Sequence, residues 1–265
     1  MNFLHRAHPD IRAEDMLYTL LLFATQPIEF INRCEWRGVT ELEEAASWRF
    51  WFEVGRRMGI PEETIPGSYK DMVEAYHAYE EQHMCPAESN EFVGRQTVKL
   101  LLYWVPGETA KRTARQLVYA VCNPRLRRGM GFPEPAAWAV WLLPALLGAR
   151  RFFLRHLALP RRDASRQRNV SDRPAENGRY FVPKYDNQPW YVPATFGNRW
   201  GLWGVVSRIL GLPVAGTEGY GEDGYEIGTV GPTAFKKVGV QTVRREAEEI
   251  MKMGSGGVGA GCPFG

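Results

Sequence analysis

The sequence has few of the residues on which many small folds and metal sites depend. Its 265 residues include 4 cysteines and 5 histidines. No two cysteines form a C-x-x-C pair, so neither a zinc knuckle nor a disulfide framework is indicated. Charge of one sign is also scarce, because 33 basic residues are offset by 30 acidic ones. A net charge of +3 provides no strong field for nucleic acid, and we expect no nucleic-acid partner.

Long apolar runs and targeting signals are also lacking. The first six residues show no basic region followed by an apolar stretch, so we predict no signal peptide. The apolar run at 16–24 has about half of the roughly 20 residues that a membrane-spanning helix needs. The run at 136–149 is short as well and contains Pro144. The sequence therefore predicts no transmembrane segment.

Common catalytic motifs are missing too. There is no G-x-S-x-G, H-E-x-x-H, P-loop or dinucleotide-binding fingerprint. No pair of carboxylates stands out among the 30 acidic residues as the acid and base of a hydrolase. Hydrolase and nucleotide-dependent chemistry are therefore not indicated by any local signature.

Helical periodicity is abundant in the first two-thirds of the chain, whereas strand-like alternation is scarce before residue 180. Asp10 is expected to cap a helix that begins near Ile11, and Thr40 with Glu43 has the spacing of a capping box. The predicted helices are near 11–33, 41–58, 69–84, 90–103, 108–121 and 135–157. We predict an all-α fold, a globin-like multi-helix bundle, over 1–162.

Aromatic and basic residues are the chain's positive features. Trp48, Trp51 and Phe52 are interpreted as core, with a cleft wall as the alternative. Eight arginines lie between 150 and 173, next to the apolar part of the last predicted helix. This segment is typical either of a helix on an anionic membrane surface or of a core helix with a solvated basic end.

The composition changes after residue 162. Residues 163–177 are polar and basic, and we interpret them as a linker. Residues 178–265 are rich in Gly, Pro, Tyr and Trp, with short helices expected at 200–210 and 242–253. We interpret this part as an extended C-terminal arm that packs its aromatic residues on the helical body. The alternative is a disordered extension that binds a partner.

A series of motifs resembles the fungal oxygenase family of the mycophenolic acid pathway, which shares a catalytic domain with bacterial rubber oxygenases (latex-clearing proteins). Each motif is loose alone, but their order and spacing together are specific. The motifs are Leu4-His5-Arg6, Glu14 to Leu20, Asn32-Arg33-Cys34-Glu35-Trp36-Arg37, Trp51-x-x-x-Gly55-x-x-Met58-Gly59-Ile60, Tyr76-x-x-Tyr79, Pro124-x-Leu126-Arg127, Met130-Gly131-Phe132-Pro133, Pro160-Arg161-Arg162, Pro189-Trp190-Tyr191-Val192 and Gly261-Cys262-Pro263-Phe264.

The resemblance implies a helical domain that holds haem b, uses dioxygen and cleaves a double bond in a hydrophobic isoprenoid-like chain. It also implies an endoplasmic reticulum or endomembrane location for an enzyme of secondary metabolism. The family's axial histidine matches His5, which would be both the metal ligand and a cofactor-binding residue. His8 is the neighbouring alternative, and a surface histidine near a frayed terminus is the other interpretation of His5.

Arg33 and Arg37 are the further cofactor-binding candidates. With Glu35 and Trp36 they would line a pocket for a haem propionate or a substrate, because arginine pairs well with carboxylates. The alternative is a structural ion-pair cluster that joins two helices.

Family members carry a region before the Leu-His element, which begins here at residue 4. We therefore expect the oxygenase-like domain to lack its N-terminal part. The second hypothesis is accordingly a non-catalytic helical protein of the same fold that binds a membrane surface or a partner.

Overall fold

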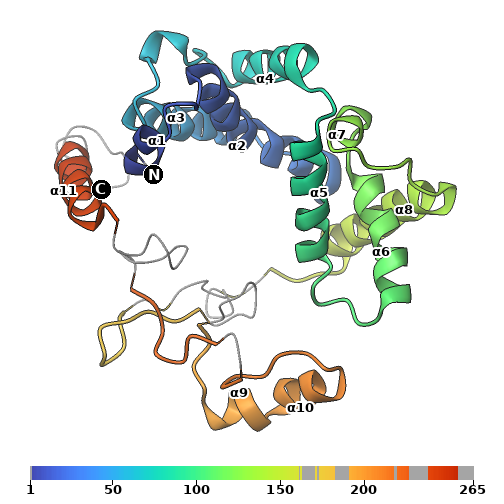
Figure 1. Ribbon diagram of the computed structural model, residues 1–265. Helices are drawn as coiled ribbons and strands as arrows, with labels where there is room; N and C mark the ends of the chain where they lie inside the picture. Colours follow the sequence, from blue (N-terminus) through green and yellow to red (C-terminus); the bar gives the residue numbers. More distant parts are fainter. Residues whose placement is uncertain are drawn as a thin grey trace. The chain divides into compact units, whose positions relative to one another are not determined.

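The computed structural model describes residues 2–160, 162, 171, 173–182, 191–217, 220–226 and 238–255. The chain divides into two compact units, Met1–Pro160 and Arg161–Gly265 (Figure 1). Most of the predicted linker at 163–177 lies outside the described residues, as do Pro189, Trp190 and the motif at 261–264. The two units are therefore described separately.

The first unit is built from helices. In chain order they are α1 (Asn2–Ala7), α2 (Ala13–Cys34), α3 (Glu41–Arg57), a 3-10 turn (Glu62–Thr64), α4 (Tyr69–His83), α5 (Glu88–Leu101), α6 (Glu108–Val121), α7 (Pro124–Gly129) and α8 (Ala137–His156). The described residues contain no strand, only an isolated bridge in the second unit. The predicted all-α fold class is confirmed.

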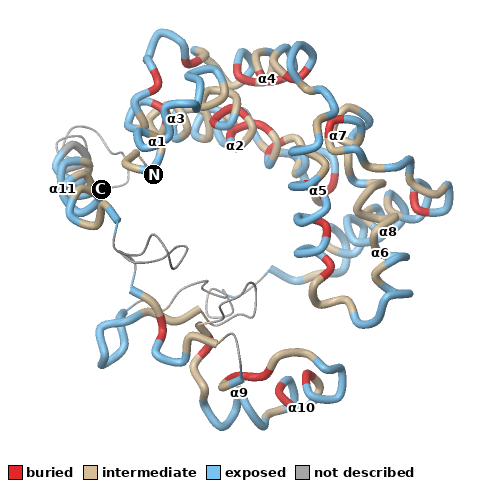
Figure 2. Tube along the Cα trace, in the orientation of Figure 1, coloured by how far each residue is buried: buried red, intermediate tan, exposed pale blue. Residues whose placement is uncertain are grey.

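The hydrophobic core of the first unit lies between α2, α3 and α4. Leu20, Leu21 and Ala24 of α2 are buried against Met72 and Tyr76 of α4. The buried positions are visible along the facing sides of α2 and α4 in Figure 2. Because these residues recur three or four positions apart, each helix turns one apolar face to the other.

Helix α3 completes this core through its apolar face. Gly55 lies so close to α2 that a Cβ there would stand 2.6 Å from Leu20 Cδ2. The partly buried rings of Trp48, Trp51 and Phe52 pack against the same cluster, and the Trp48 indole donates to the Pro66 carbonyl at 2.9 Å. These three aromatic residues are therefore part of the core, as interpreted from the sequence.

The N-terminus of α3 has the predicted cap, whereas the N-terminus of α2 does not. The Glu43 amide donates to Thr40 Oγ1 at 3.3 Å, and the Thr40 amide donates to Glu43 Oε2 at 2.8 Å, which completes the capping box of α3. The predicted Asp10 cap of α2 is wrong. Helix α2 begins at Ala13, and Arg12 at its N-cap position makes no side-chain cap hydrogen bond.

Helix α8 is apolar and largely exposed. It has 20 residues and continues through Pro144. By length and composition alone it could cross a membrane, and very little of it is buried. The sequence analysis expected no such segment because the apolar run at 136–149 is shorter than the helix that contains it. Helix α6 covers one side of α8.

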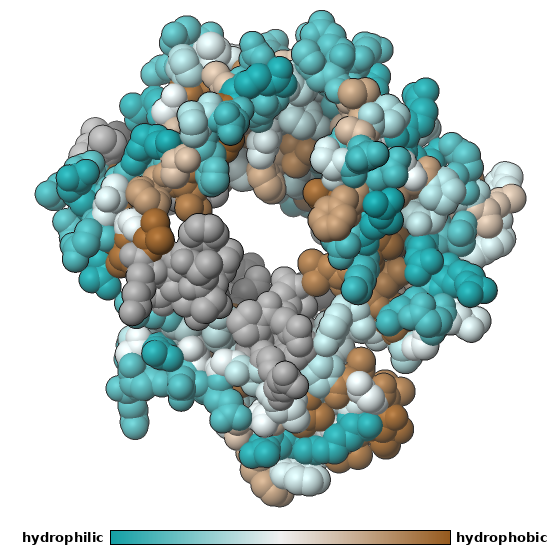
Figure 3. Space-filling view, in the orientation of Figure 1, coloured by the Kyte–Doolittle hydropathy of each residue, from teal (hydrophilic) through white to brown (hydrophobic). Residues whose placement is uncertain are grey.

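The second unit has short helices and extended segments. Helices α9 (Phe196–Trp200) and α10 (Leu202–Ile209) are packed together, and α11 spans Val240–Ser255. Helices α10 and α11 confirm the two helices predicted in the C-terminal part. Figure 3 shows apolar side chains gathered over α9 and α10, where Phe196, Leu202 and Ile209 are each more than three-quarters exposed.

Candidate functional site

His5 lies in α1, a helix that the sequence analysis did not predict. The Asn2 side-chain amide donates to the Arg57 carbonyl at 2.8 Å, which attaches α1 to the C-terminal end of α3. The His5 ring is half-buried, and its Nδ1 atom is buried without a hydrogen-bond partner among the described residues. A buried, unpartnered ring nitrogen is unusual, because buried polar groups are almost always hydrogen-bonded.

Arg33 lies near the C-terminal end of α2 and lines a cavity of about 320 Å³ between α2, α6 and α8. Its guanidinium is 5.8 Å from the ring centre of Phe30. The walls are mostly apolar, with two arginines; they comprise Phe30, Arg33, Cys34, Ala120, Val121, Leu143, Pro144, Leu147, Gly148 and Arg151. This α2–α6–α8 cavity has the composition of a site for an apolar molecule with an anionic group.

Arg37 and Glu35 form ion pairs instead of facing a cavity. Arg37 donates to both carboxylate oxygens of Glu43 at 2.8 Å, and the Arg37 guanidinium lowers the pKa of Glu43 to about 2. Arg150 of α8 pairs with Glu35 at 2.9 Å. The Glu43 pair therefore links the segment after α2 to α3, and the Glu35 pair links the end of α2 to α8. Such pairs correspond to the structural ion-pair cluster given above as the alternative.

The described contacts place His5, Arg33 and Arg37 in different surroundings. Asn2 of α1, three residues before His5, is bonded to the C-terminal end of α3. Arg33 lines the α2–α6–α8 cavity, whereas Arg37 is bound to Glu43 in the first turn of α3. Neither the α2–α6–α8 cavity nor the Arg37–Glu43 pair includes His5.

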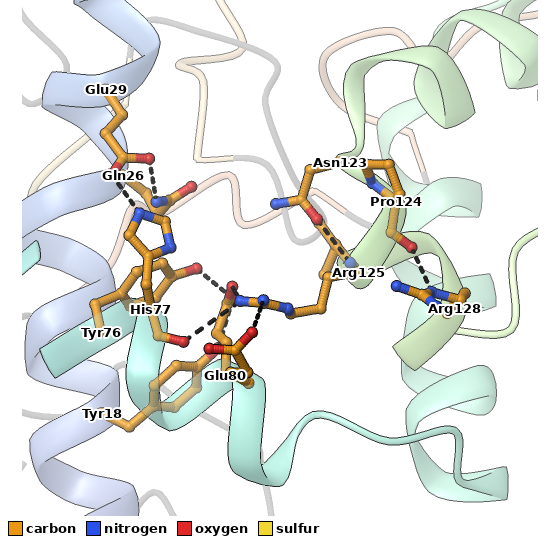
Figure 4. A network of polar contacts seen from close by, with 12 residues as sticks. Tyr18, Gln26, Glu29, Tyr76, His77, Glu80, Asn123, Pro124, Arg125 and Arg128 are labelled. Carbon is orange, nitrogen blue, oxygen red and sulfur yellow. Dashed lines mark hydrogen bonds and ion pairs between the residues drawn. The ribbon is translucent and has the colours of Figure 1, made fainter. Parts of the chain in front are cut away.

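A buried carboxylate that the sequence analysis did not single out joins α2, α4 and α7 (Figure 4). Glu80 is 3% exposed. It accepts a hydrogen bond from the Tyr76 hydroxyl and another, at 3.3 Å, from the Tyr18 hydroxyl. The Arg125 guanidinium lies 3.7 Å from Glu80 Oε2. We call these four residues the Glu80 cluster.

The Glu80 cluster borders a cavity of about 610 Å³. Glu80 and Arg125 line it with Glu81, Met84, Cys85, Pro86, Arg128, Gly131 and Phe132. Burial, with the nearby Glu80 charge, raises the pKa of Tyr18 to about 12, and burial and the hydrogen bond to Glu80 raise that of Tyr76 further. Both tyrosines therefore remain protonated donors to the carboxylate over the physiological pH range.

A sequence signal for Glu80 existed. Met72, Tyr76 and Glu80 occur at i, i+4 and i+8, and so share the face of α4 that contacts α2. An acidic residue on an otherwise apolar face predicts a buried, paired carboxylate. His77 and His83 on the same helix are exposed.

The sequence resemblance implies His5 as an axial haem ligand, and the structure shows the surroundings of its ring. A metal-ligating imidazole binds the metal through one nitrogen and donates the other N–H to an acceptor, and the buried Nδ1 atom of His5 has no such acceptor among the described residues. His5 lines neither the α2–α6–α8 cavity nor the cavity beside the Glu80 cluster. Among the described residues, no group of three or more His, Cys, Asp or Glu side chains is placed to hold a metal ion.

Comparison with known proteins decides the family. Residues 5–153 match the family described as "ER-bound oxygenase mpaB/B'/Rubber oxygenase, catalytic domain". The chain belongs to this family. It is 33% identical to the "ER-bound oxygenase mpaB'" of Penicillium brevicompactum, over 99% of this chain and 64% of that protein. It is 32% identical to the "ER-bound oxygenase mpaB" of the same organism, over 82% of this chain and 52% of that protein.

The mpaB-family match begins at His5 and ends within α8. It therefore covers the α2–α3–α4 core, the Glu80 cluster and the α2–α6–α8 cavity, all of which lie in the first unit. The chain spans less than two-thirds of the length of these two relatives.

Proposed function

We propose that this chain belongs to a haem-dependent oxygenase that uses dioxygen and acts on a hydrophobic isoprenoid-like chain, by oxidative cleavage of a carbon–carbon double bond. Its family, which groups oxygenases with rubber oxygenases, supports the proposal. The observation that carries it is the match of residues 5–153 to this oxygenase family, which begins at the half-buried His5.

His5 is the residue that we propose as the axial ligand of haem b. Haem b would supply an iron centre that binds and activates dioxygen. The chain's own contribution is to hold the imidazole: the bond from Asn2 to the Arg57 carbonyl attaches α1 to α3 and so sets the orientation of His5. Arg33 and Arg37 stay predicted cofactor-binding residues; Arg33 lines the α2–α6–α8 cavity, and Arg37 is paired with Glu43.

We also propose a membrane surface as a partner of α8, and an endomembrane location. Two curated relatives are named ER-bound. In this chain, Trp141, Phe152 and Phe153 of α8 are each more than half exposed, and Arg151 and Arg155 lie in the same helix. Aromatic side chains at the acyl boundary with arginines at the headgroups are typical of a membrane-contacting helix.

The haem proposal is tested by absorption spectroscopy of the protein produced with haem supplied. We expect a Soret band in the parent chain and in His8→Ala, and its loss in His5→Ala. His8 is the matched control because it is an exposed histidine three residues further along the chain. An unchanged Soret band in His5→Ala would contradict the assignment.

Absence of bound haem from the parent chain would instead favour the second candidate function. That function is a non-catalytic member of the family that binds a membrane surface or a partner, and the exposed apolar face of α8 is the observation in its favour. Membrane binding that persists without any haem would support it.

A further inference from the structure

A further cavity in the first unit combines apolar walls with positive charge. It has a volume of about 400 Å³ and lies between α5 and α6. We call it the α5–α6 cavity. Its lining residues are Arg95, Val98, Lys99, Leu102, Glu108, Lys111, Arg115, Tyr119 and Phe132. This volume is within the usual range of small-molecule sites, which is about 300–1,000 Å³.

The charges of the α5–α6 cavity are unbalanced. It is lined by four basic residues and by one acidic residue, Glu108. Arg95 pairs with Glu91 at 3.3 Å and Lys111 with Glu108 at 3.5 Å. Lys99 and Arg115 have no partner among the described residues, so two positive charges lining the cavity are available to a ligand.

Arg115 is the more informative of these two residues. Its side chain is half-buried, although a guanidinium has five N–H donors and is always charged. Its guanidinium has no acceptor among the described residues and stays accessible, so a ligand in the cavity can reach it. A carboxylate or phosphate in the α5–α6 cavity would supply the acceptor, and arginine binds either of them through two parallel hydrogen bonds.

The remaining walls of the α5–α6 cavity are apolar. Val98 of α5 and Leu102, the residue after that helix, are buried. The rings of Tyr119 and Phe132 pack with their centres 5.1 Å apart. An anion alone would leave these walls without a partner. A ligand with an apolar body and an anionic end would satisfy both halves of the cavity.

We propose that the α5–α6 cavity binds an amphipathic anion, an apolar chain or ring that ends in a carboxylate or phosphate. In this site Arg115 and Lys99 hold the anionic group, and Val98, Leu102, Tyr119 and Phe132 contact the apolar body. The site shares no residue with the proposed haem ligand His5. Its test therefore does not depend on haem binding or on oxygenase activity.

The experiment is calorimetric titration of the full chain with three ligands of equal chain length: dodecanoate, dodecyl phosphate and neutral dodecanol, each kept monomeric. We expect one or both anions to bind at a single site and dodecanol to bind at least tenfold more weakly. Butyrate, which has the carboxylate without the long chain, should bind weakly as well. Binding of dodecanol as tight as that of the anions, or no binding of either anion, would overturn the proposal.

Variants locate the binding site. Arg115→Gln and Lys99→Gln should each weaken binding of the preferred anion about tenfold, as expected for the loss of one charge-assisted hydrogen bond. Arg112→Gln is the matched control, because Arg112 is an exposed cation of the same helix that does not line the cavity. Arg33→Gln controls for the α2–α6–α8 cavity, and a larger loss in this variant than in Arg115→Gln would overturn the assignment.

The source of the anionic group is decided by a parallel measurement with vesicles. Phosphatidic acid vesicles, with phosphatidylcholine vesicles as the control, present the phosphate at a membrane surface. Retention by phosphatidic acid vesicles without any binding of monomeric anions would overturn the proposal of a cavity ligand. Circular dichroism of each variant confirms that it remains folded, so a loss of affinity reports on the site.

Discussion

At the scale of single residues, polar side chains in this protein hold helices together through specific partners. Asp15, in the first turn of α2, accepts hydrogen bonds from Arg12 at 2.9 Å and from the Tyr79 hydroxyl of α4. The Arg12 guanidinium, together with the Tyr79 hydroxyl, lowers the pKa of Asp15 to about 2. The ionised carboxylate is thus the form that links α2 to α4.

Stability should therefore depend on Asp15 in a pH-dependent way. Its unfolded pKa is about 3.9, so the stabilisation is complete above that value and is lost as the pH falls through about 2. We expect Asp15→Asn to lower the free energy of unfolding by about 1 kcal/mol at pH 7, a figure reduced for the side chain's 40% exposure. Urea unfolding at pH 7 and pH 2 measures it.

The matched control for Asp15 is Asp10→Asn, at an exposed acidic residue just before the same helix. At pH 7, Asp10→Asn should have the same midpoint of urea unfolding as the parent chain. The same loss of stability in Asp15→Asn at both pH values would show that the ionised carboxylate is not the source of the stabilisation.

The Glu80 cluster and the motif from Arg33 to Arg37 show that a sequence pattern does not determine which distant residues are in contact. The helical face that carries Glu80 is visible in the sequence, but Tyr18 lies 62 residues away along the chain. Only the packing of α2 on α4 makes them partners. In the same way, Arg33 and Arg37 are four residues apart in one motif, but Arg33 lines a cavity whereas Arg37 pairs with Glu43.

At the scale of secondary structure elements, helix α8 has one side packed on α6 and an apolar surface without a partner among the described residues of the first unit. Trp141 is 81% exposed there, and Leu146, Phe152 and Phe153 are each more than half exposed. Exposed apolar patches of this kind mark interaction sites. The arginines in the last two turns favour an anionic membrane as the partner.

We expect Trp141→Gln to weaken binding of the protein to vesicles of phosphatidylcholine and phosphatidylserine about fivefold, because a large apolar side chain no longer leaves water on binding. Co-sedimentation with the vesicles measures the change. Leu42→Gln on α3 is the control, since Leu42 is also highly exposed, at 79%, but stands outside α8. Equal losses in both variants would contradict a specific role of α8.

At the scale of the whole molecule, the chain has two compact units, and the boundary between them in the sequence lies between Pro160 and Arg161. We propose that the sequence interpretation holds here: an oxygenase-like helical domain over 1–162, a linker over 163–177 and an arm over 178–265. The described helices of the first unit end at His156. The chain beyond Pro160 has five arginines between 161 and 173. All of them except Arg173, which precedes Pro174, are potential trypsin sites.

Limited trypsin digestion should therefore cut first between 161 and 173. Proteases need an extended backbone, which a packed helix does not offer without opening. We expect intact mass spectrometry to detect an early fragment that contains the whole first unit. Arginines within α3 and α5 are the internal controls, and first cuts at Arg56 or Arg95 would contradict the proposed division.

The amino-acid sequence by itself determined the features that depend on neighbouring residues. Helical periodicity and the Thr40–Glu43 capping box act over a few positions, so the all-α class and most helix boundaries could be predicted. The spaced motifs were enough to identify the family. The unpredicted helices α1, α7 and α9 are short, with six, six and five residues.

Only the tertiary structure decided which distant residues meet. It paired Arg37 with Glu43 and Arg150 with Glu35, buried Glu80 beneath Tyr18 and Arg125, and left Arg115 in a cavity without an acceptor among the described residues. These contacts depend on how whole helices pack, and helix packing depends on the shape of entire faces. Local patterns determine each face, whereas the partner of each face is determined by the fold.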